Sequence, residues 1–414
     1  VYVSRISESA VTALSLAFPV QNLQIGFAVG IGVGVNSLLS KSLGEGNQEA
    51  ANRTAGNGIF LMLIATVLFM LFGAFGTKGY YSLFNVNETT RQYGIDYTSI
   101  CCIFTLGIFV EILGERLLQA SGRTFYTMIT QGVGAIVNIV LDPVFIFGVE
   151  PLGIAPMGIA GAAIATVIGQ WVAAILAVIF NWKFNPDVQF APSFCKPRAA
   201  SLRPILTVGI PSIIMMGIGS VMNFAMNQIL QGFSETATGV FGIYFKLQSF
   251  FFMPLFGINN ATISIIAFNY GARNPKRITA TLLRATGSAL CIMIVGLLAF
   301  QLLPDLLLGI FQPSDEFLRI GRSALRIISL CFPAAAIGIS LSASFQALGN
   351  GIYATIISLC RQMLVLVPAA YLLSLAGEVT YVWWSFPIAE VVSLALTLLF
   401  FLRIYRQKIK PLFS

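Results

Sequence analysis

Apolar residues dominate the chain in long runs that short polar segments separate. Each run holds about 20 or more mainly apolar residues, the length that an α-helix needs to cross the hydrocarbon core of a bilayer. Eleven runs are found, at about residues 10–38, 55–76, 95–120, 124–148, 157–181, 205–231, 237–264, 279–303, 322–347, 351–375 and 380–403. The pattern predicts an all-α polytopic membrane protein, because helices satisfy their own backbone hydrogen bonds inside lipid.

The basic residues between the runs predict the orientation of the chain. One set of alternate connections holds 16 Lys and Arg residues and the opposite set holds 4. Connections rich in basic residues stay in the cytoplasm, so the C-terminus is expected inside and Val1 outside. The richer set is Lys41, Arg53, Arg116, Arg123, Lys183, Lys196, Arg198, Arg203, Arg273, Lys276, Arg277, Arg284, Arg403, Arg406, Lys408 and Lys410.

An internal repeat relates the two halves of the chain. Phe18-Pro-Val-Gln21 resembles Phe245-Lys-Leu-Gln248 at an offset of 227 residues, and further matches keep this offset without gaps. Duplicated halves are typical of secondary transporters. At the same offset, the partner of run 205–231 falls before Val1. We therefore expect a twelve-helix, 6+6 pseudo-twofold protein with eleven helices in this chain and the first largely missing.

The repeat also predicts the domain organisation. We expect an N-terminal lobe at residues 1–181, a basic cytoplasmic linker at 182–204, a C-terminal lobe at 205–403 and a cytoplasmic tail at 404–414. Two lobes of six helices share one orientation, so an axis along the membrane normal relates them. A cleft between such lobes can open alternately to each side of the membrane.

Composition narrows the classes of function. Hydrophobic residues make up 57% of the chain and charged residues 10%, whereas soluble domains carry about 25% charged residues. The chain has no histidine, so it offers no Ser-His-Asp triad, no histidine-ligated metal and no imidazole relay. The six cysteines lack CxxC spacing, and no phosphate-binding loop is present. We expect no enzyme, no cofactor, no metal centre and no nucleic-acid partner.

Asn138 and Asp142 form the most distinctive polar pair inside an apolar run. They are four residues apart and therefore lie on one face of a helix. Pro143 follows and cannot donate a hydrogen bond, so a carbonyl one turn earlier is left free. The next run carries Thr166 and Gln170 at comparable depth. These groups suit a proton or a small hard cation such as Na⁺, or equally a structural hydrogen-bond network.

Other charged and polar side chains inside the runs require a structural or functional role, because placing a charge at bilayer depth costs about 2.5–3.5 kcal/mol. Glu111 lies near the midplane, where it either carries coupling or pairs with a neighbouring helix. Glu115 falls near the membrane edge and is expected at the interface. For Glu390, an ion pair with Lys246 or Arg361 is favoured over a substrate site. The candidate substrate or secondary polar residues are Glu111, Gln170, Gln21, Gln248, Lys246, Arg361 and Glu390.

Three stretches of sequence carry a resemblance to a known family. They are Gln131-Gly-Val-Gly-Ala-Ile-Val-Asn138-Ile-Val-Leu-Asp142-Pro143-Val-Phe-Ile-Phe-Gly148, Gly158-Ile-Ala-Gly161-Ala-Ala-Ile-Ala-Thr166, and Leu118-Gln119-Ala-Ser-Gly122-Arg-Thr124. Together they resemble the MATE family of multidrug and toxin extrusion transporters. The resemblance covers essentially the whole chain. The Asn-xx-Leu-Asp-Pro motif is typical of a bacterial branch with an acid on its fifth helix.

The resemblance implies twelve helices in two lobes of a bacterial inner membrane protein. It implies export of organic cations or amphipathic drugs by antiport against H⁺ or Na⁺, and we expect a monomer. Asn138, Asp142 and Thr166 would belong to a cation-coupling cluster, together with an aspartate expected just before Val1. Another branch couples through acids on helices seven and ten, but the corresponding runs here contain no Asp or Glu.

Two other functions stay open at this point. A lipid-linked oligosaccharide flippase of the same superfamily should show a cationic cavity for pyrophosphate and more helices. A non-transporting membrane receptor or scaffold would have no use for buried carboxylates and duplicated halves.

Overall fold

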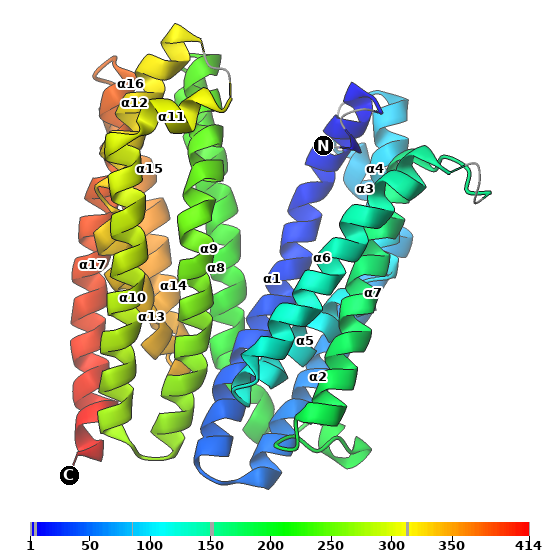
Figure 1. Cartoon of the computed structure of the whole chain (residues 1–414), viewed down its shortest axis with the longest axis vertical. Coiled ribbons are helices and arrows are strands. Elements are labelled where there is room, and N and C mark those ends of the chain that lie inside the picture. Colours follow the sequence, from blue (N-terminus) through cyan, green and yellow to red (C-terminus); the bar gives the residue numbers. More distant parts are fainter. Residues whose placement is uncertain (1, 4–5, 85, 150–152, 312–313, 414) are drawn as a thin grey trace. The chain divides into compact units, whose positions relative to one another are not determined.

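The computed structural model describes residues 2–3, 6–84, 86–149, 153–311 and 314–413 (Figure 1). These residues are almost entirely helical, apart from short connections and one isolated bridge between Val149 and Ile154. Among them, nine helices are long and apolar enough to cross a membrane, and two bent helix pairs bring the number of spans to as many as eleven. The predicted all-α class and the eleven predicted spans are confirmed.

The chain divides into two compact units, Val1–Ile213 and Ile214–Ser414, and the boundary lies inside α8. The predicted lobes, linker and tail stay predictions. Unit 1 holds α1 (Glu8–Gly44), α2 (Gln48–Leu71), the π-helical turn η2 (Phe72–Gly76), α3 (Thr77–Ser82), α4 (Glu88–Ile103), α5 (Leu106–Ala120), α6 (Thr124–Phe147), α7 (Gly158–Phe184), the 3₁₀ turn η4 (Pro192–Cys195) and the first part of α8 (Ala199–Gln231).

Unit 2 holds the remainder of α8 and the helices that follow it. These are α9 (Glu235–Gly271), α10 (Pro275–Leu302), α11 (Pro304–Gly309), α12 (Asp315–Ser329), α13 (Phe332–Ala347), α14 (Gly351–Leu359), the π-helical turn η5 (Cys360–Leu366), α15 (Val367–Ser374), α16 (Val379–Trp383), α17 (Ser385–Ile404), the π-helical turn η6 (Tyr405–Ile409) and the 3₁₀ turn η7 (Lys410–Leu412).

The internal repeat extends to the ends of the helices. Helices α1 and α9 begin and end 227 residues apart, and so do α3 and α11. The pairs α4–α5 and α12–α13 also correspond, and each is bent by 46°. The same capping residue starts both long helices, because the Ser7 and Ser234 hydroxyls each accept a hydrogen bond from the backbone N–H three residues later (3.1 Å). The repeat seen in the sequence is therefore a repeat of structure.

Glycines let α1 and the first part of α8 approach closely within unit 1. A Cβ on Gly34 would lie 2.2 Å from the carbonyl oxygen of Ile205, and one on Gly30 would lie 2.9 Å from that of Gly209. The four-residue spacing of these glycines on α1 is a packing motif, because it aligns small residues on one face.

Buried asparagines of α2 hold the segment that joins α7 to α8. The Asn52 side chain accepts a hydrogen bond from the backbone N–H of Gln189 (2.8 Å), and Asn57 accepts one from that of Arg198 (2.9 Å). Asn57 is fully buried and also donates to the carbonyl oxygen of Phe194 (3.3 Å). These side chains supply the partners that an irregular backbone segment would otherwise lack.

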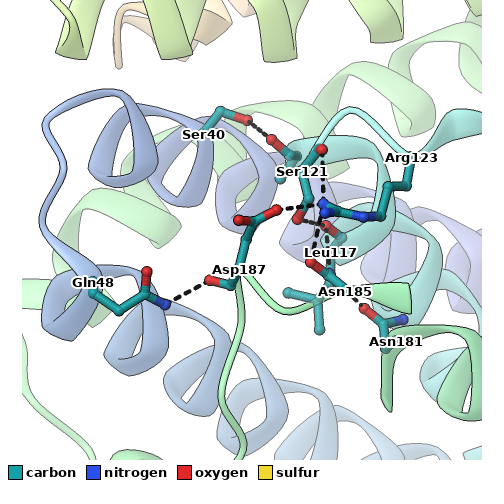
Figure 2. Close-up of polar contacts among 9 residues, drawn as sticks. Ser40, Gln48, Leu117, Ser121, Arg123, Asn181, Asn185 and Asp187 are labelled. Carbon is teal, nitrogen blue, oxygen red and sulfur yellow. Dashed lines mark hydrogen bonds and ion pairs between the residues drawn. The ribbon is translucent and has the colours of Figure 1, made fainter. Parts of the chain in front are cut away.

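Figure 2 shows the polar contacts at the start of the same segment. Arg123, in the connection between α5 and α6, forms an ion pair with Asp187 and donates to the carbonyl oxygen of Ser121 (3.1 Å). The Asn185 amide donates to the carbonyl oxygen of Leu117 (3.5 Å). The segment after α7 is thus attached to the end of α5 as well as to α2.

Replacing Asn57 with leucine is expected to loosen this segment. The change leaves the N–H of Arg198 and the carbonyl oxygen of Phe194 without this partner, at a cost of about 1–3 kcal/mol. Trypsin should then cleave the Arg198–Ala199 bond of the purified protein about tenfold faster or more, as each 1.4 kcal/mol lost gives about a tenfold larger opened population.

The matched control is Asp187→Asn, which removes only a partly exposed ion pair whose side chains are 25% and 44% exposed. Such pairs contribute at most about 1 kcal/mol, so cleavage should change little. Equal acceleration in both variants would show that the buried asparagine does not hold the segment.

Candidate coupling and ligand sites

Helices α6 and α7 approach closely in unit 1, and this approach positions the Asn138 motif. A Cβ on Gly134 would lie 3.0 Å from the carbonyl oxygen of Gly169, and one on Gly169 would lie 2.8 Å from that of Gly134. The same Cβ on Gly169 would lie 3.1 Å from the Cβ of Asn138. Thr166 is three residues before Gly169 and therefore shares its face of α7.

The structure brings three predicted residues together at this approach. The Asn138 amide nitrogen Nδ2 donates to Asp142 Oδ1 (3.4 Å) and to Thr166 Oγ1 (3.4 Å). The Thr166 hydroxyl in turn donates to the carbonyl oxygen of Ala162 one turn earlier (2.9 Å). The amide thus uses its two N–H groups to join a carboxylate on its own helix to a hydroxyl on the next.

This arrangement leaves oxygen atoms available at a half-buried carboxylate. Among the described residues, the Asp142 carboxylate accepts a side-chain hydrogen bond only from Asn138, and the side-chain amide oxygen Oδ1 of Asn138 accepts none. Pro143 lies inside α6 without breaking it, so the helix continues with one backbone donor missing. A carboxylate, an amide oxygen and a hydroxyl form a donor set that a proton or Na⁺ can use.

Tyr97 is a member of this polar network that the sequence analysis missed. Its side chain on α4 is 5% exposed, its hydroxyl interacts with that of Thr166, and it accepts a hydrogen bond from the Gln21 amide of α1 (3.1 Å). The network therefore runs through α1, α4, α7 and α6. A lone tyrosine in an apolar run carries no spacing signal, so only the packing of the helices reveals it.

Other candidates in unit 1 lie outside the network. Gln170 is one turn beyond Thr166 on α7, and neither it nor Glu111 forms a hydrogen bond with another described side chain. Glu115 is buried among the helices, with only 3% of its surface exposed, and its expected place near the membrane edge stays a prediction. Both of its oxygens are satisfied by α6, through the Thr130 hydroxyl and the Gln131 amide (2.8 Å each).

Unit 2 pairs Glu390 with Arg361, one of the two alternatives left by the sequence. Arg361 Nη1 lies 3.3 Å from Glu390 Oε2, whereas Lys246 is exposed on α9. Arg361 belongs to the π-helical turn η5, and Glu390 to α17. A π-turn widens a helix locally and is frequent at functional sites.

The Arg361–Glu390 pair lines a cavity of about 380 Å³ whose lining residues all belong to unit 2. Gln248, the repeat partner of Gln21, lies on the same wall. Part of the remaining wall is aromatic or thioether, beside uncharged polar residues such as Ser249 and Gln362, and the aromatic and thioether part includes Met215, Met222, Tyr244, Phe245, Phe252 and Phe386. The cavity thus combines an adaptable apolar wall with one ion pair, a composition typical of sites for small molecules.

Comparison with known proteins decides the class of this protein. The family model described as MatE matches residues 1–144 and 211–372, which is most of the chain. The chain belongs to the MatE family. It is a multi-pass membrane transporter and not an enzyme, and the resemblance seen in the sequence is confirmed at the level of the family.

The chain is similar to several curated relatives along nearly all of its length. It is 25% identical over 395 residues to the multidrug export protein MepA of Staphylococcus haemolyticus, covering 95% of this chain and 86% of the relative. It is 23% identical over 390 residues to a FAD transporter of Shewanella oneidensis, covering 94% of this chain and 86% of the relative.

Solved MATE structures share the fold. One is an outward-facing multidrug resistance MATE transporter of the MOP superfamily, with a TM-score of 0.91 and 25% identity over 99% of this chain and 90% of that chain. Another is a MOP superfamily transporter from Pyrococcus furiosus, with a TM-score of 0.89 and 25% identity over 100% of this chain and 91% of that chain. The twelve-helix pseudo-twofold layout fits these structures.

Proposed function

We propose that this MATE chain is a secondary active multidrug exporter. It moves organic cations or amphipathic drugs outward in exchange for H⁺ or Na⁺, with Asp142 as the residue that binds the coupling ion. The observation that carries the proposal is the double hydrogen bond of Asn138, which holds Asp142 beside Thr166 and leaves carboxylate oxygen available. The similarity to multidrug export proteins supports drugs as the exported class.

Neutralisation of Asp142 is the proposed driving step. In the outward-open state a proton or Na⁺ enters at Asp142, and Asn138 and Thr166 help to bind it. An ion at this site removes the net negative charge that attracts a cationic drug, so the affinity for the drug falls. The drug leaves outward, the lobes close, and the inward-open state releases the ion and binds the next drug.

Pro143 links the ion site to the conformation of α6. Because proline lacks an N–H, α6 carries one hydrogen bond fewer beside Asp142 than a regular helix. Helices bend most easily where such a bond is missing. A change of charge at Asp142 therefore occurs next to the part of α6 that can bend with the smallest loss of backbone hydrogen bonding.

The balanced charge of the unit 2 cavity is evidence against the flippase alternative. A site for pyrophosphate needs excess positive charge, but Glu390 neutralises Arg361 in this cavity. We place the C-terminus in the cytoplasm, on the count of basic residues between the spans, and we propose a monomer as the working unit.

Reconstitution of the full chain into proteoliposomes tests the proposal. Ethidium efflux should increase when a proton gradient or a sodium gradient is imposed, and the effective gradient identifies the coupling ion. Efflux that is the same with both gradients collapsed would contradict antiport, and absence of ethidium movement under either gradient would contradict drug export.

A further inference from the structure

The cavity of unit 2 contains an ion pair with unused hydrogen-bonding capacity. The contact between Arg361 Nη1 and Glu390 Oε2 is 3.3 Å long and is the one hydrogen bond that either side chain makes among the described residues. A guanidinium has five N–H donors, and a carboxylate has two acceptor oxygens. The Glu390 side chain is 8% exposed and that of Arg361 is 28% exposed, and both line the cavity, so their unused hydrogen-bonding groups are available to a molecule that enters it.

Two amide oxygens on the same cavity wall also lack partners. Gln248 Oε1 and Asn259 Oδ1 are buried, and neither accepts a hydrogen bond from the described residues. Both residues belong to α9, and both line the cavity with Arg361 and Glu390. Buried acceptors without a donor are unfavourable, so these oxygens favour a ligand that brings N–H groups.

The charges of the cavity restrict the net charge of such a ligand. Arg361 and Glu390 sum to zero, and a ligand of single charge would leave a net charge among apolar walls. A zwitterion can divide the internal pair into two pairs, with its anionic group on Arg361 and its ammonium group on Glu390. The site then stays neutral, and both side chains gain hydrogen bonds.

We propose that the unit 2 cavity is a binding site for aromatic zwitterions. The anionic group of the ligand binds Arg361 and its ammonium group binds Glu390. Gln248 and Asn259 lie about three turns apart on α9, so separate N–H groups of the ligand, on its ammonium and on its ring, donate to their two amide oxygens. Its ring packs against the aromatic wall that includes Tyr244 and Phe252. Binding of such ligands would extend the substrate range of the proposed exporter. Only this physiological role rests on the proposed function, because binding itself is tested without transport.

Three indoles of nearly equal size test the charge requirement. Calorimetric titration of the purified full chain should show tenfold or greater preference for tryptophan, a zwitterion, over tryptamine, a cation, and indole-3-propionate, an anion. Equal binding of all three, or tightest binding of tryptamine, would overturn the proposal. The titration needs no ion gradient, so failure of the antiport proposal leaves its outcome unaffected.

Substitutions distinguish a ligand site from a merely structural ion pair. The double variant Arg361→Gln with Glu390→Gln keeps the cavity neutral, and its preference for tryptophan over tryptamine should disappear. Arg284→Gln, on the exposed side of α10, is the control and should bind tryptophan as the wild type does.

Asn259→Leu provides a second test that does not depend on the ion pair. Leucine has a similar volume and removes a buried acceptor that has no partner, so the protein should fold with an unchanged or higher Tm. Tryptophan affinity should nevertheless fall several-fold, because a donor of the ligand loses its acceptor. A higher Tm with unchanged affinity would contradict the proposed contact.

Discussion

Asp142→Asn is expected to reduce ion-driven drug efflux by about a hundredfold in the reconstituted full-length protein. Asparagine has nearly the same shape, so the contact with Asn138 can persist, but its amide neither binds a proton at physiological pH nor carries a charge for Na⁺. Loss of a charged interaction of about 1.5–3 kcal/mol corresponds to this order of effect. Exchange of labelled for unlabelled drug, which needs no coupling ion, should persist in the variant at drug concentrations high enough to offset its lower affinity.

A second carboxylate serves as the control for this result. Asp315 is exposed in the first turn of α12, far along the chain from the α6–α7 network. Asp315→Asn should leave both ion-driven efflux and drug exchange near the wild-type rates. Undiminished ion-driven efflux by Asp142→Asn would remove Asp142 from the coupling mechanism.

Gly34→Ala is expected to destabilise unit 1 strongly. The new Cβ would lie 2.2 Å from the carbonyl oxygen of Ile205, and a backbone atom cannot rotate away as a side chain can. Helices α1 and α8 must then separate, at a cost of about 1–3 kcal/mol for a single added methyl group. A lower Tm of the purified protein, measured by tryptophan fluorescence or calorimetry, is the expected outcome.

Gly132→Ala makes the same chemical change where space is available. No atom lies within 4 Å of the Cβ position of Gly132 on α6, and alanine favours a helix by about 0.5–1 kcal/mol over glycine. Its Tm should be unchanged or higher. Helix propensity alone would raise the Tm of both variants, so a similar loss of Tm in both would mean that the close approach of α1 to α8 is not what makes Gly34→Ala destabilising.

Most of the fold could be predicted from the sequence because a bilayer requires long apolar helices, and such helices can be recognised in a single chain. A span must be apolar along its whole length, so the runs from 10–38 to 380–403 could be counted directly. The offset of 227 found in the sequence is also the spacing between the ends of α1 and α9 and between those of α3 and α11. The 46° bends after Ile103 and Ser329 were not predicted, because tertiary packing rather than composition sets them.

Residue spacing alone predicted the part of the candidate site whose residues share a helix, whereas Thr166 on the next helix was predicted from its depth and from the family resemblance. Asn138 and Asp142 are four residues apart, so helical geometry alone brings them together. Tyr97 reaches the same network from α4, and its sequence context gives no sign of that contact. The choice of Arg361 over Lys246 as partner of Glu390 likewise depended on packing, including a π-helical turn that no spacing rule anticipates.

The central claim is that the coupling ion and the cationic drug compete through Asp142. The most direct measurement is the affinity of the purified full-length protein for ethidium as a function of pH and of Na⁺ concentration. In the wild type, affinity should fall as pH falls or as Na⁺ rises, whereas in Asp142→Asn it should depend on neither ion. The same ion dependence in both proteins would contradict the account.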